Sequence, residues 1–190
     1  MTENFNSYIE HIEADFWREL CLTEGELRHY ERGMEFARAG EVAPYIGYIK
    51  SGILKYVTRS VDGTEHVIGL EFENEFVADF PFSLYGQPAK ASIITVTPSD
   101  IYCVPSKVIR SRMETDSRMR DIIMQSTVAI FSTVYDRYKS LYSETPQQRY
   151  KELIKLHSDL FMKFPLKDIA SFLNITPTHL SRLRKNNGQM

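Results

Sequence analysis

The fold is decided by the stretch from Leu166 to Lys185, LKDIASFLNITPTHLSRLRK, because it contains two apolar helical patterns around a tight turn. In the first pattern the apolar residues recur at helical spacing, and they are Leu166, Ile169, Ala170 and Leu173. Asn174 follows, and asparagine tolerates the left-handed conformation that ends a helix.

A second helix of this stretch has its own start signals. Thr176 suits the N-cap position, and Pro177 fits the first helical position, where no backbone donor is needed. Leu180 and Leu183 give the second helix an apolar face, and Ile175 fills the corner between the helices. The stretch therefore predicts a helix-turn-helix.

The outer face of the second helix is polar and basic, which suits a DNA groove. Arg182 is the candidate for base readout, because arginine pairs bidentately with guanine. Arg184 and Lys185 are expected on phosphates, which position a protein without reading sequence. The predicted DNA-binding residues are Thr176, Thr178, His179, Ser181, Arg182, Arg184 and Lys185. A helical hairpin with a solvated basic face is the alternative, but capping, turn and charge together favour DNA binding.

Charge divides unevenly along the chain of 190 residues, which is 43% hydrophobic and 25% charged, an ordinary globular composition. Residues 145–190 contain 8 Lys and Arg and 3 Asp and Glu, a net charge of +5. The remaining 144 residues contain 15 Lys and Arg and 22 Asp and Glu, a net charge of −7. A basic end on an acidic body suggests that only the end meets a polyanion.

Cys21 and Cys103 are the only cysteines, and no secretory leader is recognisable. We expect buried reduced thiols and a cytoplasmic location. No apolar run reaches membrane-spanning length, so no membrane partner is expected.

The first hundred residues change character near Leu27. Before it, apolar residues from Phe5 to Leu20 recur at helical spacing and predict an opening helix or helix pair, and Thr23 and Glu26 have capping-box spacing. After it, turn signals separate apolar runs about every eight to twelve residues, as in a sandwich or barrel-like sheet. The expected strands are residues 45–50, 53–59, 65–72, 91–97 and 101–104, with Asp62-Gly63 as a hairpin turn and a helical turn or loop at 80–88.

A short helix is expected from Pro105-Ser106 to about Glu114, and a long one from about Ser117 to Ser143. The long helix carries one apolar seam of Met124, Val128, Phe131, Tyr135, Tyr138 and Tyr142 and another of Ile123, Thr127, Ile130, Val134 and Leu141. One seam can cover the sheet, while the other needs a partner, most simply a second copy in a parallel coiled coil. The predicted dimer interface is Ile123, Thr127, Ile130, Phe131, Val134, Tyr138 and Leu141. The alternative is a helix buried within one monomer.

Thr145-Pro146 begins a further helix whose apolar residues are expected to pack under the helix-turn-helix, namely Tyr150, Leu153, Ile154 and Leu156. The predicted organisation is a domain built on the sheet at 1–116, a dimerisation helix at 117–143 and a DNA-binding domain at 144–190.

In this order of elements the chain resembles the Crp/Fnr family of bacterial transcription regulators, which includes the cyclic-AMP receptor protein. The matching marks, which are specific in their order and spacing, are Gly40-Glu41, residues 48–52, Asp62-Gly63, residues 74–77, Arg149 and residues 169–182. The resemblance implies an α+β fold: an N-terminal cyclic-nucleotide-binding-like β-roll (jelly-roll), a long dimerisation helix and a C-terminal helix-turn-helix.

The chain departs from the family at the nucleotide pocket. The family uses a Gly-Glu pair for the ribose and an Arg-Ser pair for the phosphate, and the aligned positions here are Ala78-Asp79 and Ala89-Lys90. Ala89 removes the bidentate guanidinium, and Lys90 is only a point charge. The candidate effector pocket is Asp79, Phe80, Lys90, Val134 and Tyr135. The resemblance therefore implies an effector other than cyclic AMP, or none; a surface salt bridge between Asp79 and Lys90 is an equal alternative to a vestigial pocket.

Cofactors are not expected. An iron–sulfur centre needs a cysteine cluster, and the five histidines show no metal-ligand spacing, so haem is not expected either. The family's C-terminal β-hairpin wing is also expected to be missing, because only residues 186–190 follow the second helix.

The leading function is a homodimeric, sequence-specific DNA-binding transcription regulator that reads a palindromic operator, with RNA polymerase as a further partner that the resemblance implies. The alternative is a module that senses a nucleotide-like ligand and signals to a protein partner without DNA. An enzyme is not expected, since no catalytic motif is recognisable.

Overall fold

The computed structural model describes residues 6–157 and 159–186, so the expected contribution of Phe5 and the question of the wing at 187–190 lie outside the described residues. The chain opens with a helical pair, the 3-10 turn η1 (Ser7–Glu10) and the helix α1 (Ala14–Glu24). The predicted capping box at Thr23 is wrong. Thr23 lies inside α1, and its hydroxyl donates to the carbonyl of Glu19 at 2.7 Å, so it cannot start a helix there.

Two antiparallel four-stranded sheets form the body, in the orders β1-β8-β3-β6 and β2-β7-β4-β5. All five expected strands are confirmed, and three short ones, β1, β2 and β6, were not predicted. The strands are β1 (Glu26–Tyr30), β2 (Glu35–Ala37), β3 (Tyr45–Ser51), β4 (Leu54–Arg59), β5 (Glu65–Glu71), β6 (Phe76–Val77), β7 (Ser92–Thr95) and β8 (Ser99–Pro105).

The hairpin at Asp62-Gly63 is confirmed, because β4 and β5 pair antiparallel around it. Gly63 has φ +83°, a left-handed conformation that glycine adopts without steric cost. The carboxylate of Asp62 accepts hydrogen bonds from the Ser60 hydroxyl at 2.6 Å and the Thr64 amide at 3.0 Å. These bonds fix the turn and lower the pKa of Asp62 to about 2. The expected helical turn at 80–88 is also present as η2 (Phe82–Tyr85).

The space between the sheets is filled by alternating apolar side chains of the inner faces, as expected for a sandwich core. Fully buried members are Ile49, Leu54, Val77, Ile93 and Ile101. Cys21 and Cys103 are buried free thiols, and burial raises the pKa of Cys21 to about 12 and that of Cys103 to about 11.

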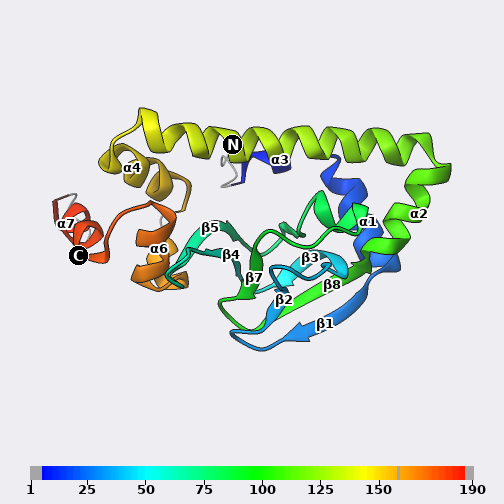
Figure 1. Cartoon of the computed structure of the whole chain (residues 1–190), viewed down its shortest axis with the longest axis horizontal. Helices are drawn as coiled ribbons and strands as arrows, with labels where there is room; N and C mark the ends of the chain where they lie inside the picture. The colour runs from blue at the N-terminus through cyan, green and yellow to red at the C-terminus, as the bar shows by residue number, and fades with distance from the viewer. Residues whose placement is uncertain (1–5, 158, 187–190) are drawn as a thin grey trace.

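Two helices follow the sheets, α2 (Ser106–Thr115) and the long α3 (Ser117–Ser143), and both match their predicted limits closely. The side chain of Asp116 caps α3 by accepting from the amides of Arg118 and Met119. α3 runs along the length of the molecule and links the sheets to the C-terminal helices (Figure 1). Its described residues, like those of every other helix, form no segment long and apolar enough to cross a membrane.

The C-terminal helices confirm the helix-turn-helix. They are α4 (Pro146–Leu156), α5 (Leu160–Lys163), α6 (Leu166–Phe172) and α7 (Pro177–Asn186). Asn174 has φ +54°, as its position after the first helix predicts. Thr145 and Gln148 form a capping box at the start of α4, and the Thr176 hydroxyl accepts the amide of His179 at 3.2 Å at the start of α7.

The C-terminal helices share a core with the second sheet. One continuous apolar cluster joins residues of β4 and β5 with α4, α5, α6 and α7, including Val57, Leu70, Tyr150, Ile169 and Leu180. α6 rests on β5, where the Val67 amide donates to the Ser171 hydroxyl at 2.9 Å. The helices that follow α3 are therefore packed on the second sheet.

Candidate functional site

The face of α7 that points away from the molecule carries most of the predicted DNA-binding residues. Leu180 and Leu183 are buried against α6, which turns the opposite face of α7 outward. The exposed residues are Thr176, Thr178, His179, Ser181, Arg182 and Lys185. α7 lies beside α6 at one end of the molecule (Figure 1).

Arg184 differs from its neighbours on α7. Its guanidinium lies over the ring of Phe161, 4.2 Å from the centroid, and the side chain is only partly exposed. A cation stacked on an aromatic ring is stabilised by that contact. The structure therefore places Arg184 in the packing between α7 and α5, a role that the sequence did not indicate.

The Arg149 side chain links the helix-turn-helix to the end of α3 by hydrogen bonds. Its guanidinium donates to the carbonyl of Glu144 at 2.7 Å and to the carbonyl of Leu173 at 3.1 Å. Glu144 is the C-terminal cap of α3 and Leu173 that of α6, so one side chain satisfies two helix ends. This joint fixes the direction in which α7 is presented.

The two seams of α3 have different environments. The first is exposed along its length, with Met124 at 65%, Phe131 at 66% and Tyr142 at 76%. In the second, Ile123 is buried against α1 and β3, and Ile130 lines a cavity beneath the helix. Of the predicted dimer interface, Phe131, Val134, Tyr138 and Leu141 are exposed, Thr127 is half-buried, and Ile123 cannot face a partner because it belongs to the monomer core. The alternative of a helix buried within one monomer is wrong for the first seam.

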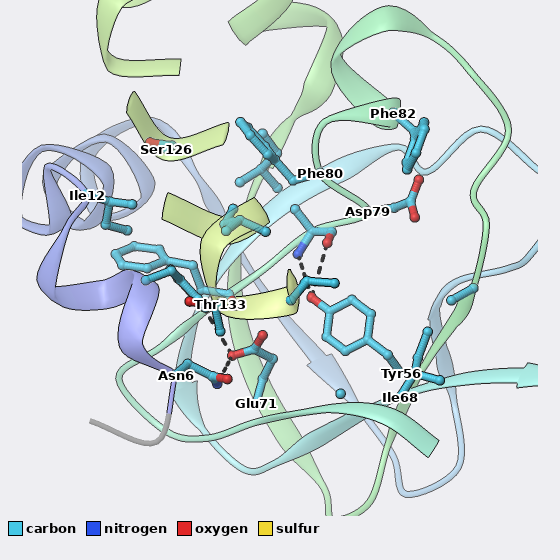
Figure 2. A pocket seen from close by; sticks show the side chains of 18 of the residues that line it. Asn6, Ile12, Tyr56, Ile68, Glu71, Asp79, Phe80, Phe82, Ser126 and Thr133 are labelled. Carbon is cyan, nitrogen blue, oxygen red and sulfur yellow. Dashed lines mark hydrogen bonds between the residues drawn. The ribbon is translucent and has the colours of Figure 1, made fainter. Parts of the chain in front are cut away.

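A cavity of about 320 Å³ lies between α3 and the sheets. It is lined mainly by apolar side chains, among them Ile12, Trp17, Ile46, Ile68, Phe76, Phe80, Phe82 and Ile130. Figure 2 shows that its wall is built from the N-terminal helices, β4, β5, the loop at Phe80 and α3. Apolar cavities with a few polar groups are typical binding sites for small molecules.

Four of the five predicted effector-pocket residues line this cavity: Asp79, Phe80, Lys90 and Val134. Tyr135 does not line it; its ring is exposed and stacks on Phe131, with centroids 5.8 Å apart. Asp79 is 7% exposed, and burial raises the pKa of its carboxyl. The alternative of a salt bridge between Asp79 and Lys90 is not formed; the contact is a hydrogen bond from the Lys90 backbone amide to Oδ1 of Asp79 at 3.4 Å.

A buried polar cluster forms one end of the cavity. The Asn6 amide donates to Glu71 at 2.7 Å and to Glu75 at 2.8 Å, and its carbonyl oxygen accepts from Arg137 of α3. The Tyr8 hydroxyl also donates to Glu71, at 3.1 Å. Burial and the neighbouring charge of Glu75 raise the pKa of Glu71 well above 4.5, while burial lowers the pKa of Arg137. No sequence motif indicated this cluster.

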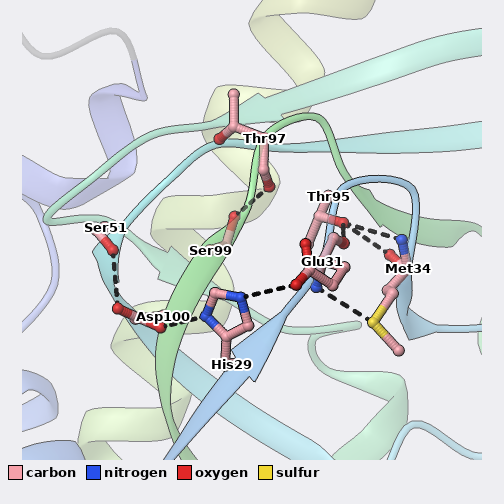
Figure 3. A network of polar contacts seen from close by, with 8 residues as sticks. All are labelled: His29, Glu31, Met34, Ser51, Thr95, Thr97, Ser99 and Asp100. Carbon is pink, nitrogen blue, oxygen red and sulfur yellow. Dashed lines mark hydrogen bonds and ion pairs between the residues drawn. The ribbon is translucent and has the colours of Figure 1, made fainter.

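Two of the histidines, His29 and His157, take part in a surface pair and in packing. Figure 3 shows His29 between Asp100, at 2.7 Å, and Glu31, at 3.5 Å, and the hydrogen bond with Asp100 raises the pKa of His29. His157 stacks on Phe72 with centroids 4.0 Å apart. Within residues 6–157 and 159–186, no three His, Cys, Asp or Glu side chains are grouped to hold a metal ion.

These features define a class of protein: a domain of two packed sheets, a long connecting helix and a helix-turn-helix. Residues 27–116 match the family model described as the cyclic nucleotide-binding domain. A search of curated protein sequences finds no match.

Solved structures show the same architecture over most of the chain. FixK2 from Bradyrhizobium japonicum is 15% identical and superimposes with a TM-score of 0.74 over 86% of this chain and 86% of its own. The c-di-GMP-responsive global regulator CLP from Xanthomonas campestris is 16% identical, with a TM-score of 0.67 over 92% of this chain and 91% of its own. TTHB099, a CRP-family transcriptional regulator from Thermus thermophilus, is 12% identical, with a TM-score of 0.62 over 85% of each chain. The fold is therefore that of Crp/Fnr regulators, as the resemblance in sequence implied.

Proposed function

We propose that this protein is a homodimeric, sequence-specific DNA-binding regulator of transcription that acts in the cytoplasm. The observation that carries the proposal is the α6–α7 unit, which buries Leu180 and Leu183 and turns Arg182 and Lys185 outward. A recognition helix presented in this way enters the major groove, where side chains can read base edges. The fold shared with TTHB099, which is described as a transcriptional regulator, supports the same conclusion.

The exposed seam of α3 supports the dimer. Six large side chains of one face, Met124, Val128, Phe131, Tyr135, Tyr138 and Tyr142, are each more than half exposed. A contiguous exposed apolar surface of this kind marks an interaction site. A second copy packed in parallel would bring two α7 helices to one side of the dimer, so that they read half-sites roughly 34 Å apart. Contact with RNA polymerase is part of the same proposal, by analogy with the family.

The sensor domain would respond to an effector in the cavity, and we propose that cyclic AMP is not that effector. Ala89 is only 4% exposed and its side chain offers no donor to a phosphate, and the Lys90 ammonium lies 5.5 Å from the centroid of the Phe82 ring. Isothermal titration of the protein with cyclic AMP should show no micromolar binding. Micromolar affinity would overturn this part of the proposal.

The regulator is tested by binding of the full chain to fluorescent genomic fragments at two salt concentrations, with sedimentation to determine its size. We expect a dimer that binds some fragments more tightly than the rest of the genomic DNA. The affinity should fall as the salt concentration rises, because binding releases counterions from the DNA. A chain that binds no fragment above background, but still assembles, would favour the rival function, a ligand sensor that signals to a protein.

A further inference from the structure

The cavity contains a buried carboxylate oxygen that has no partner. Asp79 is 7% exposed, and among the described residues no donor lies within hydrogen-bond distance of its Oδ2. Its Oδ1 has only the Lys90 amide, at the long distance of 3.4 Å. An unsatisfied buried carboxylate destabilises the folded protein. A bound molecule that donates a hydrogen bond would remove that penalty.

The surroundings of Asp79 suit an apolar ligand. Figure 2 shows Asp79 beside the ring of Phe82, and Phe80 also lines the cavity. The remaining wall adds Trp17, Phe76 and Ile130. The indole N–H of Trp17 donates to the Ser126 hydroxyl at 3.0 Å, so it is already paired and presents only its apolar surface to a ligand.

The charges of the lining select against an anion. Of the two basic side chains, Arg137 donates to Asn6 and lies beside the carboxyls of Glu71 and Glu75. Lys90 is exposed and directs its ammonium at the Phe82 ring. Arg137 is thus engaged in the buried polar cluster, and the Lys90 ammonium lies over the Phe82 ring, while Oδ2 of Asp79 keeps an open acceptor. A negative group placed next to Asp79 would lie beside a buried carboxylate, and two like charges that share a buried site repel each other.

We propose that the cavity binds a compact, mainly apolar molecule that carries one cationic amine, with the amine donating to Oδ2 of Asp79. The inference deepens the proposed function and rests on it for the identification of the cavity as the effector site. A nucleotide phosphate is the opposite kind of ligand.

Three indoles of matched shape test the charge directly: tryptamine, which is a cation, tryptophol, which is neutral, and indole-3-acetate, which is an anion. Calorimetry and ligand-detected saturation-transfer NMR on the full chain would measure their binding. A hydrogen bond to a charged group is worth enough to expect that tryptamine binds about tenfold or more tightly than tryptophol. Indole-3-acetate should bind most weakly of the three.

Asp79→Asn keeps the shape of the side chain and removes its charge. The variant should lose the preference for tryptamine over tryptophol while it still binds tryptophol. Asp121→Asn is the matched control, because Asp121 is exposed on α3 and outside the cavity. Thermal unfolding of each variant would establish that both are folded.

The proposal is overturned if indole-3-acetate binds as tightly as tryptamine, if Asp79→Asn keeps the wild-type preference, or if tryptamine does not bind at millimolar concentration. Competition by cyclic AMP for the same cavity would also count against it. DNA binding by the unliganded protein is measured separately, so the loss of the amine site and the failure of the regulator function give different results.

Discussion

The basic side chains of α7 have different roles, and single substitutions should separate them. Arg182 is exposed and has no partner among the described residues, whereas Arg184 stacks on Phe161. Arg182→Ala should cost about 1–3 kcal/mol of binding to the best site and relax base preference at one position. Lys185→Ala should weaken binding to all sequences alike and lower the salt slope by about one unit. Competition across a randomised half-site library would measure both. Unchanged preferences in Arg182→Ala would show that this residue does not read bases.

Arg184 belongs to the packing of the helix-turn-helix, so its substitution should act on stability. Arg184→Ala removes the stacked guanidinium and should lower the free energy of unfolding by about 0.5–1 kcal/mol. Urea unfolding followed by circular dichroism would measure the change, with Arg182→Ala as the matched control on the exposed face. A stability loss of equal size in both variants would remove the distinction.

Glu71 makes stability depend on pH. Its folded-state pKa is raised above 4.5 by burial and by Glu75, so the folded protein holds a proton that the unfolded chain releases. The resulting contribution to stability is full below about pH 4.5 and is lost as pH rises toward the folded-state pKa. Glu71→Gln keeps an acceptor for Asn6 and Tyr8 but no longer titrates. We expect unfolding free energy to fall less between pH 5 and pH 8 in this variant, while exposed Glu73→Gln follows the wild type.

The elements show what a sequence pattern can predict. Strands with apolar alternation, such as β4 and β5, and helices with clear caps, such as α4, were predicted because their signals are local. β1 reads Glu-Leu-Arg-His-Tyr, without an apolar face, and it forms because β8, about seventy residues later, pairs with it. β6 has two residues, which is too short for any period. The capping-box pattern at Thr23 was outweighed by the apolar face that continues α1 through Cys21.

α3 is the element whose outer face should determine assembly. Phe131 is 66% exposed and lies in the middle of the first seam. A charge buried at this position in a dimer would lack a partner, so Phe131→Glu should yield folded monomer. Gln125→Glu, an exposed polar position on another side of α3, should remain dimeric. Sedimentation equilibrium distinguishes the two, and a wild-type monomer at micromolar concentration would remove the basis of the dimer.

At the scale of the whole molecule, the cavity and the helix-turn-helix meet at β5. Ile68 and Glu71 of this strand line the cavity, while Val67 and Leu70 belong to the core shared with α6. The sequence could not indicate this arrangement, because it depends on contacts over long separations, such as 104 residues between Val67 and Ser171. The polar cluster is equally remote in sequence, since Asn6 and Arg137 are 131 residues apart. An effector bound in the cavity would therefore contact β5, the strand on which α6 packs. This shared strand could couple the cavity to the helix-turn-helix.

The docking of α6 on the sheet includes one nearly buried ion pair, Lys55 with Asp168 at 2.9 Å, whose side chains are 15% and 8% exposed. Asp168→Ala would leave the Lys55 ammonium without a partner in an apolar setting, and should lower the free energy of unfolding by about 3 kcal/mol. The double variant Lys55→Met with Asp168→Leu contains no unpaired buried charge, so it should recover most of the lost free energy of unfolding. Asp136→Ala is the control, because its pair with Lys139 is more than 60% exposed and worth little. Urea unfolding of the three variants gives the comparison. If the double variant is as unstable as Asp168→Ala, the loss comes from the packing of α6 on β5 and not from the unpaired charge.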